Sequence, residues 1–240
     1  PMPLPPQTPA TIDPEWIAAE AIRLINIPSV TMDEAAVCVC FGQQLRDLGL
    51  DVDIREVTPG RNNLYACIPG TGDGPGLIFN GHLDTIPIGD HAPPYREGDR
   101  LYGRGSTDMK GGMAAMLGAA RALLQSDVQL QGDVWLTAVV GHEEVEANKD
   151  GPKALIEDIN TGRIGGDRII IVEGRDALWV MSMGSMVFTI TLTSDKGGMH
   201  TQYVPFSENP IRFVGELIQC IYNRQQELGT DAVHPLAGAE

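Results

Sequence analysis

Three short apolar segments constrain the fold of this chain more than any other feature. They are residues 77–79, 134–140 and 169–172, and helical patterns separate them. Unbroken apolar runs of this length are typical of strands covered on both faces, as in a parallel sheet. The sequence therefore predicts an α/β fold in which a mostly parallel sheet has helices on both faces.

Each of these segments ends in side chains that can bind a metal ion or move a proton. His82 and Asp84 follow the first, His142-Glu143-Glu144 follows the second, and Glu173 follows the third. In open α/β sheets, ligands bind beyond the carboxyl ends of the strands. We therefore expect these residues to meet at one edge of the sheet.

A fourth contribution comes from Asp108, within GRGSTDMKGG at residues 103–112. An apolar face of helical spacing follows it, so Asp108 is expected at a helix N-terminus, where backbone N–H groups favour an ionised carboxylate. Two interpretations stay open: Asp108 binds a metal ion, or it only caps the helix. A phosphate-binding loop is excluded, because Asp108 stands where the dinucleotide motif requires glycine.

The residue types at these positions suit a metal centre. His82, Asp108, Glu144 and Glu173 offer one imidazole and three carboxylates, a set that suits zinc, cobalt or manganese. Three carboxylates also suit two ions bridged by an aspartate. Asp84 is placed to orient His82, and Glu143 is left as the general base that deprotonates the attacking water.

Each of these residues also has a structural interpretation. A single histidine such as His82 is often structural, adjacent glutamates often form a solvated edge, and Glu173 can be an exposed strand end. His142 is interpreted as structural or as a support for a ligand.

Composition and charge exclude several classes of partner. The chain has 32 acidic and 17 basic residues, a net charge of -15, which argues against nucleic acid or an anionic membrane as a partner. No apolar run reaches transmembrane length, and residues 1–10 lack signal-peptide features, so we expect a cytoplasmic location. Cys38, Cys40, Cys67 and Cys220 fit neither a disulfide framework nor a zinc pair, and we expect them to be buried.

The pattern changes along the chain and suggests three parts. Residues 1–10 form a proline-rich arm, and residues 11–184 form the metal-binding domain. Beyond Gly184, apolar and threonine residues alternate over 188–193, which predicts a strand with one solvated face. A helix follows that Asn209 caps and Pro210 begins. Residues 185–240 are therefore predicted to begin a smaller α+β domain.

The motifs together resemble a known family. GHLDTIP at 81–87, GRGSTDMKGG, HEE at 142–144 and IVEG at 171–174 are similar to motifs of the co-catalytic zinc hydrolases, which include acetylornithine deacetylase, succinyl-diaminopimelate desuccinylase, aminoacylase and carboxypeptidase G. The resemblance implies that His82, Asp108 and Glu173 hold one Zn²⁺ and that Asp108 bridges to a second held by Glu144. Glutamate at 173 resembles the deacylases and carboxypeptidases more than the aminopeptidases.

The resemblance also has implications for the second part of the chain. Residues 185–240 resemble the start of a lid that forms a homodimer, and His200 resembles a lid histidine that stabilises the oxyanion in the neighbouring active site. From the residues alone, His200 is an exposed polar residue in a glycine-rich loop. Family members continue further and supply a last histidine to the second metal, so the chain looks like the N-terminal part of such an enzyme.

The sequence therefore predicts a metal-dependent amidohydrolase that cleaves N-acyl amino acids or short peptides, with Zn²⁺ or, as substitutes, Co²⁺ or Mn²⁺. The alternatives are a metallo-carboxypeptidase or dipeptidase of the same family, a non-catalytic metal-binding domain, and a structural protein in which the carboxylates are caps and strand ends.

Overall fold

The structure of the protein is a computed structural model that describes residues 11–90, 93–174, 189–193, 203, 205, 207 and 209–228. Contacts divide the chain into two compact units, Pro1–Leu178 and Trp179–Glu240, and we describe each by itself. The predicted arm at residues 1–10 and the predicted boundary at Gly184 lie outside the described residues.

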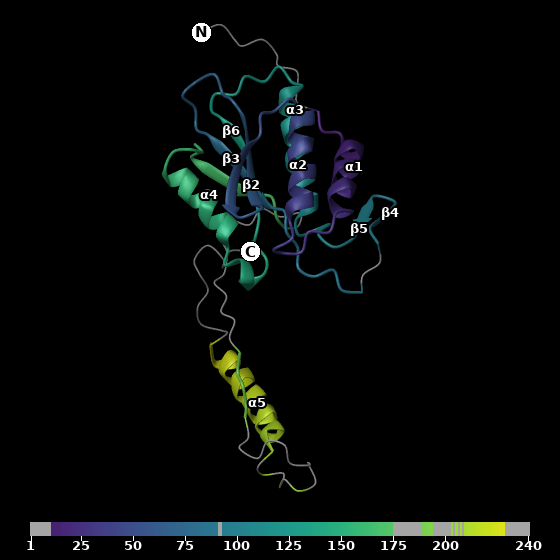
Figure 1. The fold of residues 1–240 in the computed structure, drawn as a ribbon, viewed down its shortest axis with the longest axis vertical. Helices are drawn as coiled ribbons and strands as arrows, with labels where there is room; N and C mark the ends of the chain where they lie inside the picture. Colours follow the sequence, from purple (N-terminus) through teal and green to yellow (C-terminus); the bar gives the residue numbers. More distant parts are fainter. Residues whose placement is uncertain are drawn as a thin grey trace. The chain divides into compact units, whose positions relative to one another are not determined.

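The first unit has three layers, with α1, α2 and α3 on one side of a central sheet and α4 on the other (Figure 1). Its helices are α1 (Pro14–Ile25), α2 (Ala35–Asp47), α3 (Lys110–Leu124), the 3₁₀ helix η1 (Val145–Ala147) and α4 (Asp150–Asn160). Its strands are β1 (Asp53–Thr58), β2 (Arg61–Ile68), β3 (Leu77–His82), β4 (Tyr95–Glu97), β5 (Arg100–Tyr102), β6 (Val134–Val139) and β7 (Arg168–Ile171). Helices on both faces of the sheet confirm the predicted fold class.

The central sheet is mostly parallel. Its strand order is β1-β2-β6-β3-β7, and β3 runs parallel to both β6 and β7. Because β2 is antiparallel to both of its neighbours, it alone runs against the other four strands. The carboxyl ends of β3, β6 and β7 therefore lie at the same edge. A separate two-stranded sheet, β4-β5, comes just before the loop that carries Asp108.

The core is divided by the sheet. The larger part lies under α1, α2 and α3 and contains Phe41, Leu45, Met113 and Leu117, all fully buried. A smaller cluster includes Tyr65, Val139 and Leu155 on the side that α4 covers. The buried residues of α2 and α3 recur at helical spacing, so each helix packs one apolar face against the strands.

Local sequence signals set one end of each of two helices. The Asp13 carboxylate accepts the Trp16 backbone N–H at 3.1 Å, and Pro14 is the first residue of α1. The last turn of α2 ends before Gly49, whose φ of +81° is in the left-handed region.

One predicted strand differs from the expectation. β7 was expected to be covered on both faces, but all four of its residues are exposed, including Ile169, Ile170 and Ile171. The reason is its place at the end of the sheet: within the described ranges no strand pairs with its outer edge. Its apolar pattern indicates a strand correctly, whereas its burial depends on what covers it.

The glycines of GRGSTDMKGG do two different jobs. Gly103 and Gly105 have φ values of +150° and +87° and form the predicted loop. Gly112, in contrast, lies inside α3, where a Cβ would clash with the backbone oxygen of Val172. Only glycine lets α3 approach the end of β7 this closely, which brings the loop before α3 next to the strand ends.

The cysteines are less uniformly buried than predicted. Cys38 is buried, Cys40 and Cys67 are half-buried, and Cys220 is exposed on α5, so the expectation is wrong for Cys220. Burial, with the nearby Glu34 carboxylate, raises the pKa of the Cys38 thiol to about 12.

We expect the Cys38 thiol to resist alkylation in the folded chain. Because the thiolate is the reactive species, iodoacetamide at a pH of about 8.5 should modify Cys38 more than about 100-fold more slowly in the native chain than in urea. Peptide mass spectrometry measures this, with the exposed Cys220 as the internal control. Equal labelling of Cys38 in both states would contradict its placement in the core.

The second unit is described only in part. Residues 189–193 are described without strand structure, and both Ile190 and Leu192 are exposed, so the strand predicted there is not observed in this segment. A strand needs a hydrogen-bonded neighbour, and the described residues provide none here.

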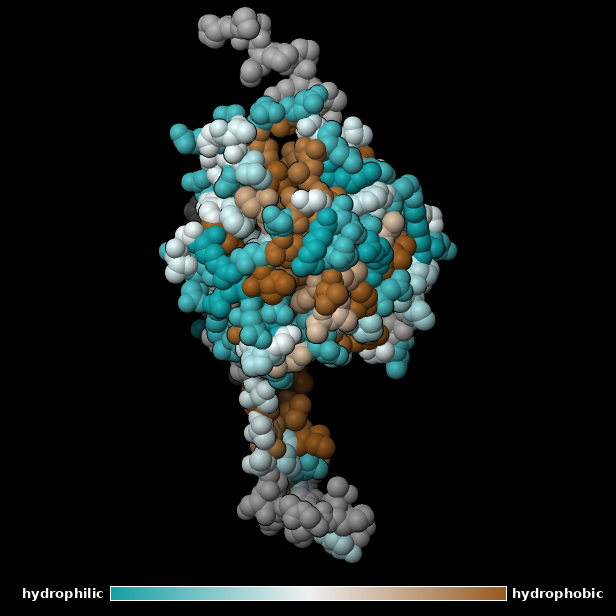
Figure 2. Space-filling view, turned by 45° about the horizontal axis from the view of Figure 1, so that its top comes forward, coloured by the Kyte–Doolittle hydropathy of each residue, from teal (hydrophilic) through white to brown (hydrophobic). Residues whose placement is uncertain are grey.

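The helix predicted in the second unit is present as α5 (Pro210–Leu228). Asn209 caps it by accepting the Ile211 N–H at 3.0 Å, as predicted. Apolar side chains run along one side of α5 (Figure 2), among them the exposed Ile211, Ile218 and Ile221. No helix in the part of the chain that the structure describes is long and apolar enough to cross a membrane.

Candidate metal-dependent active site

The register of the parallel strands brings the predicted site residues together. His82 at the end of β3 pairs with Val139 of β6, three residues before His142. On the other side, Asn80 pairs with Ile171, and the Val172 N–H continues the ladder to the Asn80 carbonyl. Glu173 therefore lies beside His82 at the strand ends, as parallel pairing requires.

His82 is the buried centre of this group. Its Nδ1 lies 2.9 Å from the backbone oxygen of Asp84, while its Nε2 lies 2.9 Å from Asp108 Oδ1. Burial alone would lower the pKa of His82, but the hydrogen bonds to Asp108 and Asp84 outweigh it and raise the pKa to about 10. With a pKa this high, His82 carries a proton on Nε2 at neutral pH, and a cation that binds Nε2 has to displace that proton.

Asp108 is not the helix cap that one interpretation predicted. Met109 is the N-cap of α3, and no side chain caps that end. The half-exposed Asp108 carboxylate instead faces His82, whose hydrogen bond lowers the pKa of Asp108. This observation favours the interpretation of Asp108 as a ligand.

Glu143 lies next to this pair. Its Oε1 is 3.4 Å from His82 Nε2, and the ligand atoms of His82, Asp108 and Glu143 all lie within 4.8 Å of one another. Partial burial, and then the charge of Asp108, raise the pKa of the Glu143 carboxyl. A raised pKa suits a group that accepts a proton from water and later returns it.

Asp84 is fully buried and holds the segment that carries Glu143. Its carboxylate accepts the His142 and Glu143 backbone N–H groups at 2.9 and 2.8 Å and the Thr31 hydroxyl at 2.8 Å. Burial opposes ionisation, but these hydrogen bonds and His82 outweigh it, so the pKa of Asp84 is lowered. The ring of His82 is oriented mainly by the Asp84 carbonyl, because the Asp84 carboxylate is 3.5 Å away.

His142 and Glu173 form a second group of potential ligands with His82. One ligand atom from each lies within 4.8 Å of the other two. The His142 ring stacks on the His82 ring, with centroids 4.4 Å apart and planes at 14°. Burial and the neighbouring His82 lower the pKa of His142 to about 4, so it stays neutral. The sequence predicts His142 as structural or as a support for a ligand, not as a ligand. Its position directly after the apolar run 134–140 was the sequence signal for a place at the site.

Two predicted residues are not brought into these groups. Glu144 is half-buried and its N–H points to the Thr31 hydroxyl at 3.4 Å, but neither three-residue group found among the described residues includes its carboxylate. His200 lies outside the described residues.

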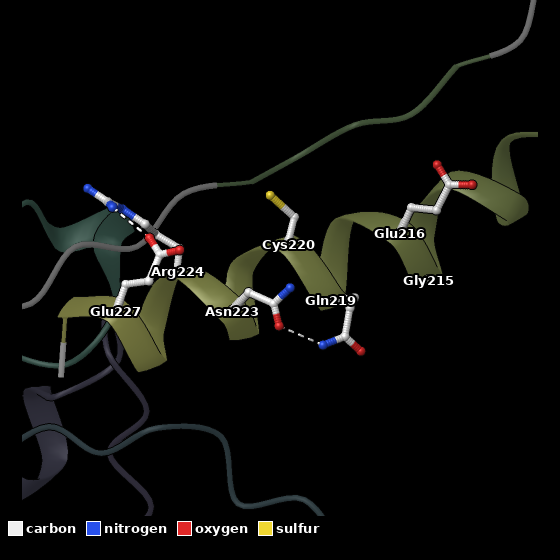
Figure 3. Close-up of a pocket in the computed structure, with 7 residues that line it drawn as sticks. All are labelled: Gly215, Glu216, Gln219, Cys220, Asn223, Arg224 and Glu227. Atoms are coloured by element: carbon white, nitrogen blue, oxygen red, sulfur yellow. Dashed lines mark hydrogen bonds and ion pairs between the residues drawn. The ribbon is translucent and has the colours of Figure 1, made fainter.

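A pocket of about 190 Å³ opens beside this centre. The loop at residues 103–108 lines it together with Ile86 and Glu143. A larger hollow of about 670 Å³ lies on α5, where Figure 3 shows side chains from Glu216 to Glu227 on the helix surface. None of the predicted site residues that the structure describes lines that hollow, whereas Asp108 and Glu143 line the smaller pocket.

Comparison with known proteins agrees with these motifs. The model of peptidase family M20/M25/M40 matches residues 78–236, about two-thirds of the chain. The chain belongs to this family. Residues 78–236 include His82, Asp108, Glu143 and Glu173, so the M20 match covers the whole cluster described above.

Solved structures of several peptidases share the fold. An aminopeptidase, PepT, from Bacillus cereus is 26% identical with a TM-score of 0.57, and covers 68% of this chain and 44% of its own. An M20 metallo-carboxypeptidase from Sulfolobus solfataricus is 25% identical with a TM-score of 0.56, covering 65% and 36%. A tripeptidase from Staphylococcus aureus is 24% identical with a TM-score of 0.57, covering 68% and 44%.

The chain spans less than half the length of each of these three peptidases. The resemblance read from the sequence is confirmed at the level of the family. A particular kinship with acetylornithine deacetylase, succinyl-diaminopimelate desuccinylase or aminoacylase stays a prediction.

Proposed function

We propose that the whole protein hydrolyses the amide bond of short peptides or N-acyl amino acids, using a metal centre at the strand ends. The observation that carries this proposal is the position of Glu143, whose carboxylate lies 3.4 Å from His82 Nε2, beside Asp108 and at the wall of a pocket. A base next to potential metal ligands and an open pocket is the arrangement that metal-assisted hydrolysis needs.

The donor atoms fit a metal ion of the zinc type. Two ligand atoms of a tetrahedral zinc ion are about 3.3 Å apart, given metal–ligand bonds of about 2.0 Å. The distance from His82 Nε2 to Asp108 Oδ1 is 2.9 Å, close to this value. In this proposal, His82, Asp108 and Glu173 would hold a first Zn²⁺, for which Co²⁺ or Mn²⁺ could substitute, and Asp108 and Glu144 would contribute to a second.

When bound, the metal would act as a Lewis acid that polarises the scissile carbonyl and makes water easier to deprotonate. The residues of the chain do the rest. Glu143 takes the proton of the attacking water and gives it to the leaving amine, a double role that its raised pKa favours. Asp84 holds Glu143 and the His82 ring in place through the hydrogen bonds described above.

The relatives support a peptide-like substrate. The PepT protein is named an aminopeptidase, and the Sulfolobus protein is named a metallo-carboxypeptidase. Both cleave amide bonds, so the reaction type of the proposal agrees with theirs. The terminus or acyl group that this protein recognises is decided by the substrate panel below.

We also propose a homodimer in which His200 of residues 185–240 assists the neighbouring active site. The exposed apolar side of α5 supports an association surface in this part of the chain. Multi-angle light scattering of the whole protein tests the stoichiometry, and a monomer at micromolar concentration would contradict this part of the proposal.

The proposed reaction is tested with the whole protein and a matched substrate panel. The panel pairs each dipeptide with the corresponding N-acetyl amino acid and with its carboxamide-capped form. We expect at least one compound of the panel to release free amine when Zn²⁺, Co²⁺ or Mn²⁺ is added. A protein that binds metal but releases no amine from the whole panel would contradict hydrolysis.

A further inference from the structure

The segment that carries Glu143 follows β6 and is held by hydrogen bonds from its backbone to side chains. Five consecutive backbone N–H groups, from Val140 to Glu144, each donate to a side-chain oxygen. Asn63 accepts the first at 3.1 Å, Glu34 the second at 3.0 Å, Asp84 the next two, and Thr31 the last. Side chains from elsewhere in the chain therefore decide where this loop lies.

Glu34 is the member of this set that the site described above does not explain. Its side chain is 0% exposed, and it makes a two-pronged ion pair with Arg61, whose side chain is 8% exposed. Arg61 Nε lies 2.9 Å from Oε2 and Nη2 lies 2.7 Å from Oε1. A buried carboxylate is tolerated when a cation and hydrogen bonds satisfy both oxygens, which is the case here.

The ion pair and the loop share one atom. Glu34 Oε1 accepts both Arg61 Nη2 and the Gly141 N–H, so the guanidinium and the loop are fixed to the same oxygen. Gly141 has a φ of +65°, and a Cβ on it would lie 2.5 Å from Arg61 Nη2. The loop therefore passes directly against the guanidinium, two residues before Glu143.

We propose that the buried Glu34–Arg61 pair positions the Glu143 loop for catalysis. This inference rests on the function proposed above and adds Glu34 and Arg61 as positioning residues. Both act through Gly141, since neither belongs to the ligand groups or lines the pocket. Because a displacement of about 1 Å at a reacting group can lower a rate about 100-fold, a small shift of this loop is enough to matter.

Substitution of Glu34 by glutamine, an amide of the same size, changes the hydrogen bonds of the side chain but not its shape. In Glu34→Gln, the single amide oxygen can still accept the Gly141 N–H. The amide nitrogen then takes the place of Oε2, where it faces the Arg61 Nε–H and cannot accept it. Arg61→Met removes the guanidinium, whereas Arg61→Lys keeps the charge but loses the two-pronged geometry. The variants therefore disturb the contacts of the shared oxygen to different degrees, while residue 143 itself remains glutamate.

Two measurements on the whole protein test the proposal. In Glu34→Gln and Arg61→Met, amide hydrogen exchange of residues 141–144 should rise at least about tenfold, while that of residues 136–138 in β6 stays unchanged. The kcat for the best substrate of the panel should fall about 10- to 100-fold, with KM within about twofold and metal content unchanged. Arg61→Lys should lie between the wild type and Arg61→Met.

Two control variants exclude a purely structural role. Asp53→Asn breaks a comparable two-pronged pair with Arg163 on the surface, and Leu45→Ala weakens the core of α2 without touching the loop. Neither should change exchange at 141–144 or kcat. If Leu45→Ala lowers kcat as much as Glu34→Gln does, or if exchange at 141–144 is unchanged in Glu34→Gln and Arg61→Met, the positioning role is wrong. A wild type without activity would contradict the proposed function, while the exchange measurement would still decide the position of the loop.

Discussion

Replacement of Glu143 by glutamine is expected to lower kcat of the whole protein by about 10²- to 10⁴-fold, the usual contribution of a general acid–base group. Glutamine keeps the size of the side chain but cannot accept the proton of the attacking water. Because Asp108, His82 and Glu173 remain, the metal content should not change. Steady-state kinetics on the best substrate and metal analysis of the same sample measure both quantities.

The matched control is Glu146→Gln. Glu146 lies three residues further along, in η1, and is exposed to solvent. The same chemical change there should leave kcat and KM unaltered. Equal activity of the Glu143→Gln and Glu146→Gln variants would contradict the role of Glu143 as the general base.

The second large effect is expected at Asp108. Asp108→Ala removes the carboxylate that lies 2.9 Å from His82 Nε2 and should lower Zn²⁺ affinity by more than about 100-fold. Loss of a residue that only supports a ligand already lowers metal affinity about 10- to 100-fold, and a ligand matters more. Isothermal titration of the wild-type and variant chains with Zn²⁺ measures the change.

The structure also separates this prediction from the capping interpretation. Since Met109 is the N-cap of α3, Asp108→Ala should leave helix content and the unfolding temperature close to those of the wild type. Circular dichroism checks both. Asp73→Asn, in an exposed turn, is the control for loss of a negative charge. Unchanged Zn²⁺ affinity together with lowered stability in Asp108→Ala would support Asp108 as a helix cap and contradict its role as a metal ligand.

The convergence of His82, Glu143 and Glu173 could be predicted because it follows from the sheet alone. An apolar run identifies each strand, and parallel pairing places the three strand ends at one edge. The bounds of α5 and the cap of α1 were predictable for a similar reason, because Asp13, Asn209 and the prolines after them act on their own neighbours.

Features that depend on distant contacts were not predictable. Whether β7 is buried depends on what covers the sheet edge, and its isoleucines look the same in either case. The Glu34–Arg61 pair joins residues 27 positions apart, and an acidic residue before a helix or an arginine at a strand start is ordinary. The role of Gly112 is similar, since the oxygen that requires glycine there belongs to Val172.

Removal of metal from the whole protein tests whether amide hydrolysis depends on a bound metal ion. Amide hydrolysis of the best panel substrate is measured before dialysis against a chelator, after it, and after return of Zn²⁺, Co²⁺ or Mn²⁺. We expect activity to disappear with the metal and to return with at least one of these ions, because we propose that His82, Asp108 and Glu173 hold the ion that the reaction needs. Hydrolysis that persists in protein shown to contain no metal would contradict a metal-dependent reaction.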